Sequence, residues 1–96
     1  MQFLQLSDFA PLLNETFLVE IDQVRTPFVL VEARPIEQRP VASMRQPFSL
    51  LFRNEAAVVF AQRTYLVSNP RLGEIGIFLV PIARDRNGFI YQALFN

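Results

Sequence analysis

Few residues in this 96-residue chain could carry out acid–base chemistry. The chain has no histidine and no cysteine, which removes the usual general base, the Ser–His and Cys–His nucleophile pairs and the commonest metal ligand. Two carboxylates, Glu20 and Glu32, share one face of adjacent strands in the register given below, flanked by Leu18 and Leu30. Burial beside these leucines would raise a carboxyl pKa, but two solvated strand charges explain the pair better. We therefore expect no enzymatic activity and no catalytic residue.

Metal, phosphate and nucleic-acid ligands are also disfavoured by the sequence. No acidic cluster has the spacing of a calcium loop or a Glu-x-x-His motif, and the three glycines are isolated from one another. The nine acidic and nine basic residues are scattered singly and sum to zero net charge, whereas a nucleic-acid binder normally shows a basic face. We expect no metal, no cofactor and no nucleic-acid partner.

The length and composition indicate a single domain over residues 1–96, since this length supports one core and 51% of the residues are hydrophobic. No run of eighteen apolar residues is present, so no membrane span is expected. The opening MQFLQLSDFAPLL lacks a basic segment and carries Asp8 and Pro11, unlike a signal peptide. The absence of cysteine fits the cytosol. We expect a cytoplasmic protein.

The first half of the chain predicts a short helix followed by two paired strands. Ser7 and Asp8 are suitable N-caps for a helix over 7–13 that plugs one end of a small sheet or barrel. The segments 15–22 and 27–34 then alternate between apolar and polar residues, with residues 23–26 as the connection between them. Their inner faces are Phe17, Val19 and Ile21 in one strand and Val29, Val31 and Ala33 in the other. The register that joins these faces pairs Ile21 with Val29 and Val19 with Val31.

This register leaves Leu18, Phe28 and Leu30 on the outer face of the two strands, which is more large apolar surface than scatter explains. They either lie under the following loop or form a contact surface. That loop, about 35–47, holds three of the seven prolines and has no periodicity. Its exposed side chains would add to a partner-binding surface, and they are Arg39, Val41, Met44 and Arg45.

The second half of the chain predicts four more strands. Segment 48–54 directs Phe48, Leu50 and Phe52 inward, whereas segment 62–69 leaves open whether Tyr65 and Val67 or Leu66 face the core. Segment 74–82 is apolar on both faces, which is typical of the innermost strand of a sheet. Within it we expect a bulge or coiling point at Gly76 and an interrupted ladder at Pro81.

A hairpin closes the chain, because Asn87-Gly88 is typical of a type I′ turn. With this dipeptide at the tip, Ile82 pairs with Ala93 and Val80 with Phe95. The register places one set of side chains on a single face: Phe89, Tyr91, Ala93 and Phe95.

Several motifs together resemble a known family. They are Leu6-Ser7-Asp8-Phe9 with Leu12-Leu13 and Thr16-Phe17, Phe48-Ser49-Leu50-Leu51-Phe52-Arg53, Thr64-Tyr65, Pro70-x-Leu72-Gly73, Phe78-Leu79-Val80-Pro81-Ile82 and Tyr91-x-Ala93 with Phe95-Asn96. The set is similar to a family of short bacterial proteins known as domain of unknown function 6916. The resemblance spans nearly the whole chain and implies a bacterial, single-domain, mostly-β protein near phage-tail-like genes, without an activity or cofactor. Family members often have His where this chain has Asn69, which favours a structural role for the turn here.

The sequence therefore predicts a mostly-β domain, a small antiparallel six-stranded barrel or sandwich with one short N-terminal helix. The leading function hypothesis is a non-enzymatic protein-interaction or assembly module, such as an accessory of a phage-tail-like or secretion assembly. Its contact surface would be Leu18, Phe28, Leu30 and the 35–47 loop, and its partner another protein or a second copy. The alternative is a small β-barrel that binds a small ligand or an oligosaccharide in an open interior.

Overall fold

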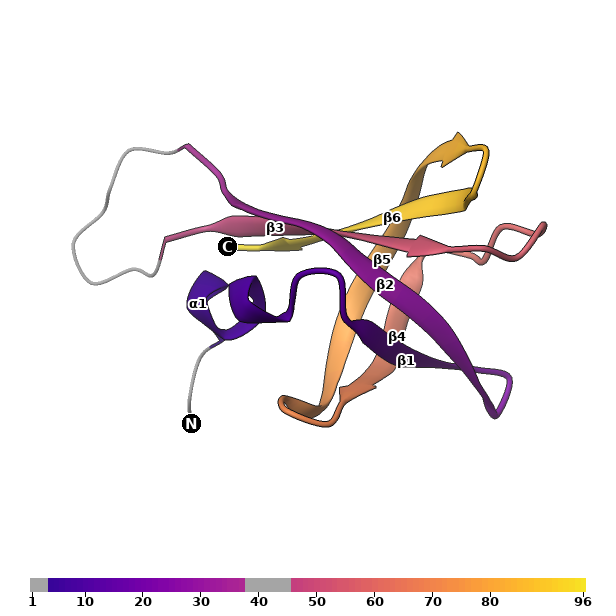
Figure 1. Ribbon diagram of the computed structural model, residues 1–96, viewed down its shortest axis with the longest axis horizontal. Helices are drawn as coiled ribbons and strands as arrows, with labels where there is room; N and C mark the ends of the chain where they lie inside the picture. Colours follow the sequence, from indigo (N-terminus) through magenta and orange to yellow (C-terminus); the bar gives the residue numbers. More distant parts are fainter. Residues whose placement is uncertain (1–3, 38–45) are drawn as a thin grey trace.

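The computed structural model of the protein describes residues 4–37 and 46–96. Within these residues six antiparallel strands form a closed barrel in the order β1-β2-β3-β6-β5-β4, with a short helical segment near the N-terminus (Figure 1). The elements are α1 (Leu6–Phe9), η1 (Ala10–Leu12), β1 (Thr16–Ile21), β2 (Val24–Pro35), β3 (Phe48–Asn54), β4 (Arg63–Asn69), β5 (Gly73–Asp85) and β6 (Gly88–Phe95). The predicted fold class is confirmed, and the structure decides for the barrel over the sandwich.

Two long strands, β2 and β5, close the barrel because each pairs with two neighbours in turn. The first half of β2 pairs with β1 and the second half with β3, while β5 pairs first with β4 and then with β6. The ladder shifts register between Leu30 and Glu32 in β2 and between Pro81 and Ala83 in β5, where bulges let a strand bend. The expected interruption at Pro81 is confirmed. The expected bulge at Gly76 is wrong, because Gly76 pairs regularly with Leu66.

The register predicted for the first two strands is wrong, and the turn between them explains why. A two-residue turn joins β1 to β2, with Asp22 and Gln23 at φ of 51° and 67°, the positive values that a type I′ hairpin requires. Ile21 therefore pairs with Val24 instead of Val29. The shift is an odd number of residues, so every side chain in the first half of β2 changes face.

The reversal places Phe28 and Leu30 in the core, where their exposed fractions are 1% and 0%. Val29, expected to face inward, lies on the opposite face, and Val31 lies in the bulge between Leu30 and Glu32. Both valines are half-buried. After the bulge the phase is restored, and Ala33 packs against the core as predicted. The inward facing of Phe17, Val19 and Ile21 in β1 is confirmed.

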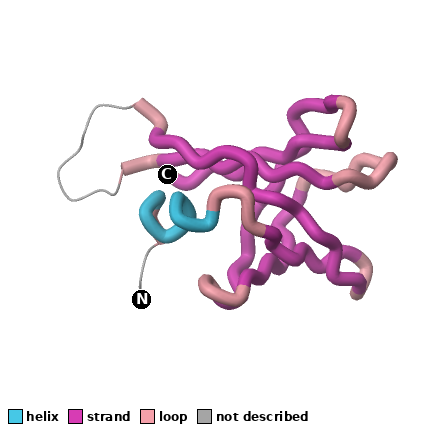
Figure 2. Tube along the Cα trace, viewed as in Figure 1, coloured by secondary structure: helices cyan, strands magenta, loops and turns pink. Residues whose placement is uncertain are grey.

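The helical segment packs into one end of the barrel (Figure 2). It begins after Gln5, whose N–H donates to the Asp8 carboxylate at 2.7 Å, so the predicted caps at Ser7 and Asp8 are corrected to Gln5. The ring of Phe9 lies 5.8 Å from that of Phe48 and 5.6 Å from that of Phe95, between centroids. This aromatic contact fixes the segment against the start of β3 and the end of β6. The arrangement agrees with the expectation that the helix plugs one end of the barrel.

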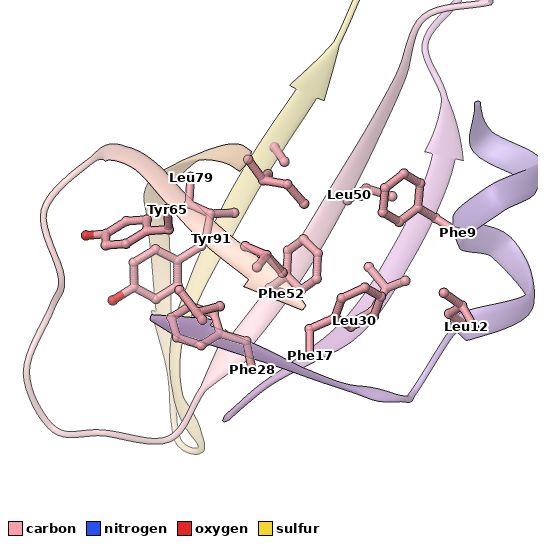
Figure 3. Close-up of a cluster of buried hydrophobic side chains, with 14 of the residues drawn as sticks. Phe9, Leu12, Phe17, Phe28, Leu30, Leu50, Phe52, Tyr65, Leu79 and Tyr91 are labelled. Atoms are coloured by element: carbon pink, nitrogen blue, oxygen red, sulfur yellow. The ribbon is translucent and has the colours of Figure 1, made fainter. Parts of the chain in front are cut away.

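Aromatic rings fill the centre of the barrel (Figure 3). Phe17 meets Phe52 edge-on at 5.3 Å, and Phe28 lies 5.1 Å from Tyr91, within the favourable range for ring pairs. The inward facing of Phe48, Leu50 and Phe52 is confirmed. In β4, Tyr65 and Val67 are buried while Leu66 points outward, which decides the facing that the sequence left open.

In the last hairpin the pairing of β5 with β6 differs from the predicted register, but the side chains that face the core are the predicted ones. Val80 pairs with Gln92 and Asp85 with Gly88, so the pairs Val80–Phe95 and Ile82–Ala93 are wrong. The turn residues are Arg86 and Asn87, because Gly88 already belongs to β6. Tyr91 and Ala93 are buried, and Phe89 and Phe95 pack against the core, as expected for the shared face.

Two buried asparagines, Asn54 and Asn69, hold the ends of β3 and β4. In each, the side-chain Oδ1 accepts a backbone N–H two residues later, from Ala56 at 3.0 Å and from Arg71 at 2.9 Å. In each, Nδ2 donates to a neighbouring strand, Asn54 to the Pro27 carbonyl at 2.9 Å and Asn69 to the Thr16 carbonyl at 3.2 Å. One amide thus closes a turn and ties it to the next strand, which is the structural role expected for the turn at Asn69.

We expect Asn69→Asp to destabilise the fold by about 2 kcal/mol at neutral pH. The carboxylate keeps the acceptor for Arg71 but loses the donor to Thr16 and is only 3% exposed at this position. Burial would raise the pKa of the new carboxyl above the ordinary value of about 3.9. The stability is therefore retained at acidic pH, where the neutral acid can donate, and lost as pH rises through the raised pKa. Urea unfolding across pH measures this slope, and a loss independent of pH would contradict the hydrogen-bond role.

Candidate interaction surface

Four large apolar side chains lie exposed on the outside of β4, β5 and β6. They are Leu66 (42% exposed), Phe78 (51%), Ile82 (48%) and Leu94 (58%), and we call this set the outer apolar face. The pair Val80–Gln92 joins β5 to β6 at its centre, two residues from Phe78 and from Leu94. Because side chains two residues apart share a strand face, Phe78 and Leu94 point to the same side, and the exposed Ile82 lies next to them in the bulge between Pro81 and Ala83.

The β4 side of the outer apolar face is built around a glycine. Leu66 pairs with Gly76, and Phe78 pairs with Thr64, so the Leu66 side chain lies diagonally across from the Phe78 ring with no side chain at Gly76 between them. Diagonal cross-strand neighbours are within reach of aromatic and long side chains. Leu66 and Phe78 therefore lie side by side on the outer surface.

The outer apolar face carries no charge within its borders. In β5 the charged residues are Glu74 near one end and Arg84 and Asp85 at the other, β6 has none, and β4 has only Arg63 at its start. Depletion of charged residues and enrichment of aromatic ones are typical of the core of a protein–protein interface. The chemistry of this surface suits contact with another apolar protein surface.

The contact residues predicted from the sequence do not form this surface. Phe28 and Leu30 are core residues, so their assignment to a contact surface is wrong, for the reason given by the β1–β2 turn. Leu18 points outward beside Pro27 and is half-buried. The four loop residues assigned to partner binding lie outside the described residues: Arg39, Val41, Met44 and Arg45.

The two carboxylates considered for acid–base chemistry are not brought together. Glu20 pairs with Arg25, while Glu32 lies seven residues further along β2, opposite Leu51. Glu32 instead forms an ion pair with Arg34 at 2.9 Å. In residues 4–37 and 46–96 no group of three acidic side chains is placed to hold a metal ion.

The end of the barrel opposite the helical segment is covered by the connection between β3 and β4. The Phe60 ring packs against Phe28 and Tyr91, and the Phe60 N–H donates to the Tyr91 hydroxyl at 2.8 Å. The Tyr65 hydroxyl donates to the Ala61 carbonyl in the same connection. Burial raises the pKa of Tyr91, so its phenol stays neutral. The filled centre and the packed Phe60 ring give no support to a ligand held inside the barrel.

The comparisons with known proteins give a family. The family model described as Domain of unknown function (DUF6916) matches residues 4–95. The chain belongs to this family. No curated protein and no solved structure matches the chain. The resemblance read from the motifs is thereby confirmed.

This DUF6916 domain shows no helix long and apolar enough to cross a membrane among its described residues.

The outer apolar face was not predicted from the sequence, although a signal for it was present. Both faces of segment 74–82 were recognised as apolar, and this was attributed to an innermost strand. In a closed barrel a strand has only one inner face, so a second apolar face must lie outside. The innermost-strand prediction is therefore wrong, since Phe78 and Ile82 are about half exposed.

Proposed function

We propose that the protein is a non-enzymatic protein-interaction or assembly module that binds through its outer apolar face. The observation that carries this proposal is the exposure of Leu66, Phe78, Ile82 and Leu94 on adjacent strands without an intervening charge. Contiguous apolar surface of this kind marks interaction sites in soluble proteins. The Phe78 ring is the expected anchor, because aromatic residues dominate binding energy at interface centres.

The partner is another protein surface or a second copy of this chain. A hydrogen-bonded strand face is rigid, so little conformational entropy is lost when it docks. The zero net charge removes long-range repulsion between copies, which favours self-association. We further propose that the protein acts in the bacterial cytoplasm, as an accessory of a phage-tail-like or secretion assembly.

Light scattering after size exclusion tests self-association at low and high micromolar concentration. We expect the wild-type mass to rise with concentration and the Phe78→Asp and Leu94→Asp variants to remain monomeric, because a carboxylate would be desolvated in the contact. The matched control is Val24→Asp, since Val24 is 62% exposed but lies beside the β1–β2 turn, outside the outer apolar face. Thermal unfolding checks that all variants keep the fold.

A wild-type protein that stays monomeric would contradict self-association and direct the test to another protein. Wild-type and Phe78→Asp proteins would then serve as paired baits. A partner retained equally by both would contradict the assignment of the outer apolar face.

A further inference from the structure

A recess of about 410 Å³ lies on the outside of the barrel, between the start of β2 and the residues that follow β3. Its apolar wall consists of Pro27, Val29 and Ala56. The Asn54 amide holds both sides of the recess in place, since Nδ2 donates to the Pro27 carbonyl and Oδ1 accepts the Ala56 N–H. The recess is thus preformed, and its volume lies in the range of small-molecule sites, which are mostly apolar with a few polar groups.

Two opposite charges, Arg53 and Glu55, line the same recess. They flank Asn54 in the chain, at the point where β3 ends. The guanidinium of Arg53 is incompletely paired: its Nε is buried without a hydrogen-bond acceptor among the described residues. Its Nη2 lies 3.3 Å from Asp85 Oδ2, in a pair whose side chains are 31% and 41% exposed. Such a partly solvated pair is weak, so a better acceptor can displace Asp85.

We propose that this recess binds a small zwitterion with an apolar body, the chemistry of a free apolar α-amino acid. Its carboxylate replaces Asp85 on Arg53, where a two-oxygen acceptor can meet the guanidinium in a bidentate pair. Its ammonium group meets the Glu55 carboxylate, and its side chain covers Pro27, Val29 and Ala56. A peptide terminus carries only one of the two charges, so it satisfies only half of this site.

L-phenylalanine is the probe that tests the proposal, titrated into the folded protein and followed by backbone amide chemical shifts. We expect saturable shifts at Val29, Arg53 and Ala56. Arg53→Met is expected to weaken binding at least about tenfold, as removal of a charged hydrogen-bond partner does, and Glu55→Gln about twofold to threefold. Asp85→Asn is expected to strengthen binding, because it releases the guanidinium. A purely structural role of Arg53 predicts no gain in this last variant.

Two half-charged probes distinguish the free amino acid from a peptide terminus. N-acetyl-L-phenylalanine keeps only the carboxylate and L-phenylalanine amide only the ammonium group, and both are expected to bind more weakly than L-phenylalanine. Equal binding of either one would overturn the zwitterion assignment in favour of a peptide terminus. The absence of shifts at Val29 and Ala56, or equal affinity in the Arg53→Met variant with its melting temperature unchanged, would overturn the site itself.

Discussion

Leu30→Glu is expected to unfold the protein. Leu30 has an exposed fraction of 0% and lies opposite Phe52 in the β2–β3 ladder, so the substitution removes core packing and places a carboxylate among apolar side chains. The combined cost is about 5 kcal/mol or more, comparable with the whole stability of a small domain. Circular dichroism and urea unfolding measure the loss.

Leu18→Glu is the matched control for this prediction. The register predicted from the sequence places Leu18 and Leu30 together on one outer face. In the structure only Leu18 lies on the outside, where it is half-buried beside Pro27. We expect this variant to fold with a loss of about 1 kcal/mol, because its carboxylate can reach water. If both variants fold alike, the two-residue turn at Asp22 and Gln23 is not the turn that the chain adopts in solution.

Gly88→Ala is expected to destabilise the protein by about 3 kcal/mol or more. A Cβ atom at Gly88 would lie 2.0 Å from the Asn54 carbonyl oxygen and 2.8 Å from the Glu55 Cα. Both obstacles are backbone, so no side-chain rotation relieves the clash, and the positive φ of 133° adds strain for a residue with a side chain. The change would push β6 away from the end of β3.

Gly73→Ala separates the two contributions to this loss. Gly73 also has a positive φ, of 87°, but a Cβ there meets nothing within 4 Å. We expect Gly73→Ala to cost only the backbone term of about 1 kcal/mol. Urea unfolding of both variants gives the difference, which is the cost of the clash, and equal losses would contradict the close approach of β6 to Asn54.

The closed barrel and the outer apolar face have a common structural cause. β5 is long enough to pair with β4 in its first half and β6 in its second, so its outer side spans both ladders. An apolar side chain on that outer side, such as Phe78, meets no other layer of the fold. The proposed interaction surface is therefore a consequence of closing a single sheet with an apolar strand in it.

The sequence by itself determined the class of fold and most of the elements. Alternation in β1 and β3 assigned Phe17, Val19, Leu50 and Phe52 to the core correctly, because period-2 burial is a local property of a strand. The turn at Asn69 and the interruption at Pro81 were also predictable, since the side chains of these residues constrain their own backbone.

Only the tertiary structure decided which side chains of β2 face the core and which face of β5 lies outside the barrel. Asp22 and Gln23 form a turn with positive φ at two residues that are not glycine, and turn preferences in the sequence do not predict such a turn. An error of an odd number of residues in the register then reverses the facing of every side chain in the paired segment. The apolar character of Phe78 suits either a core position or an exposed contact surface. Which of the two it occupies depends on how the strands close into the barrel. The contact surface was for this reason placed on Phe28 and Leu30, which the closed barrel buries, instead of on Phe78, which it exposes.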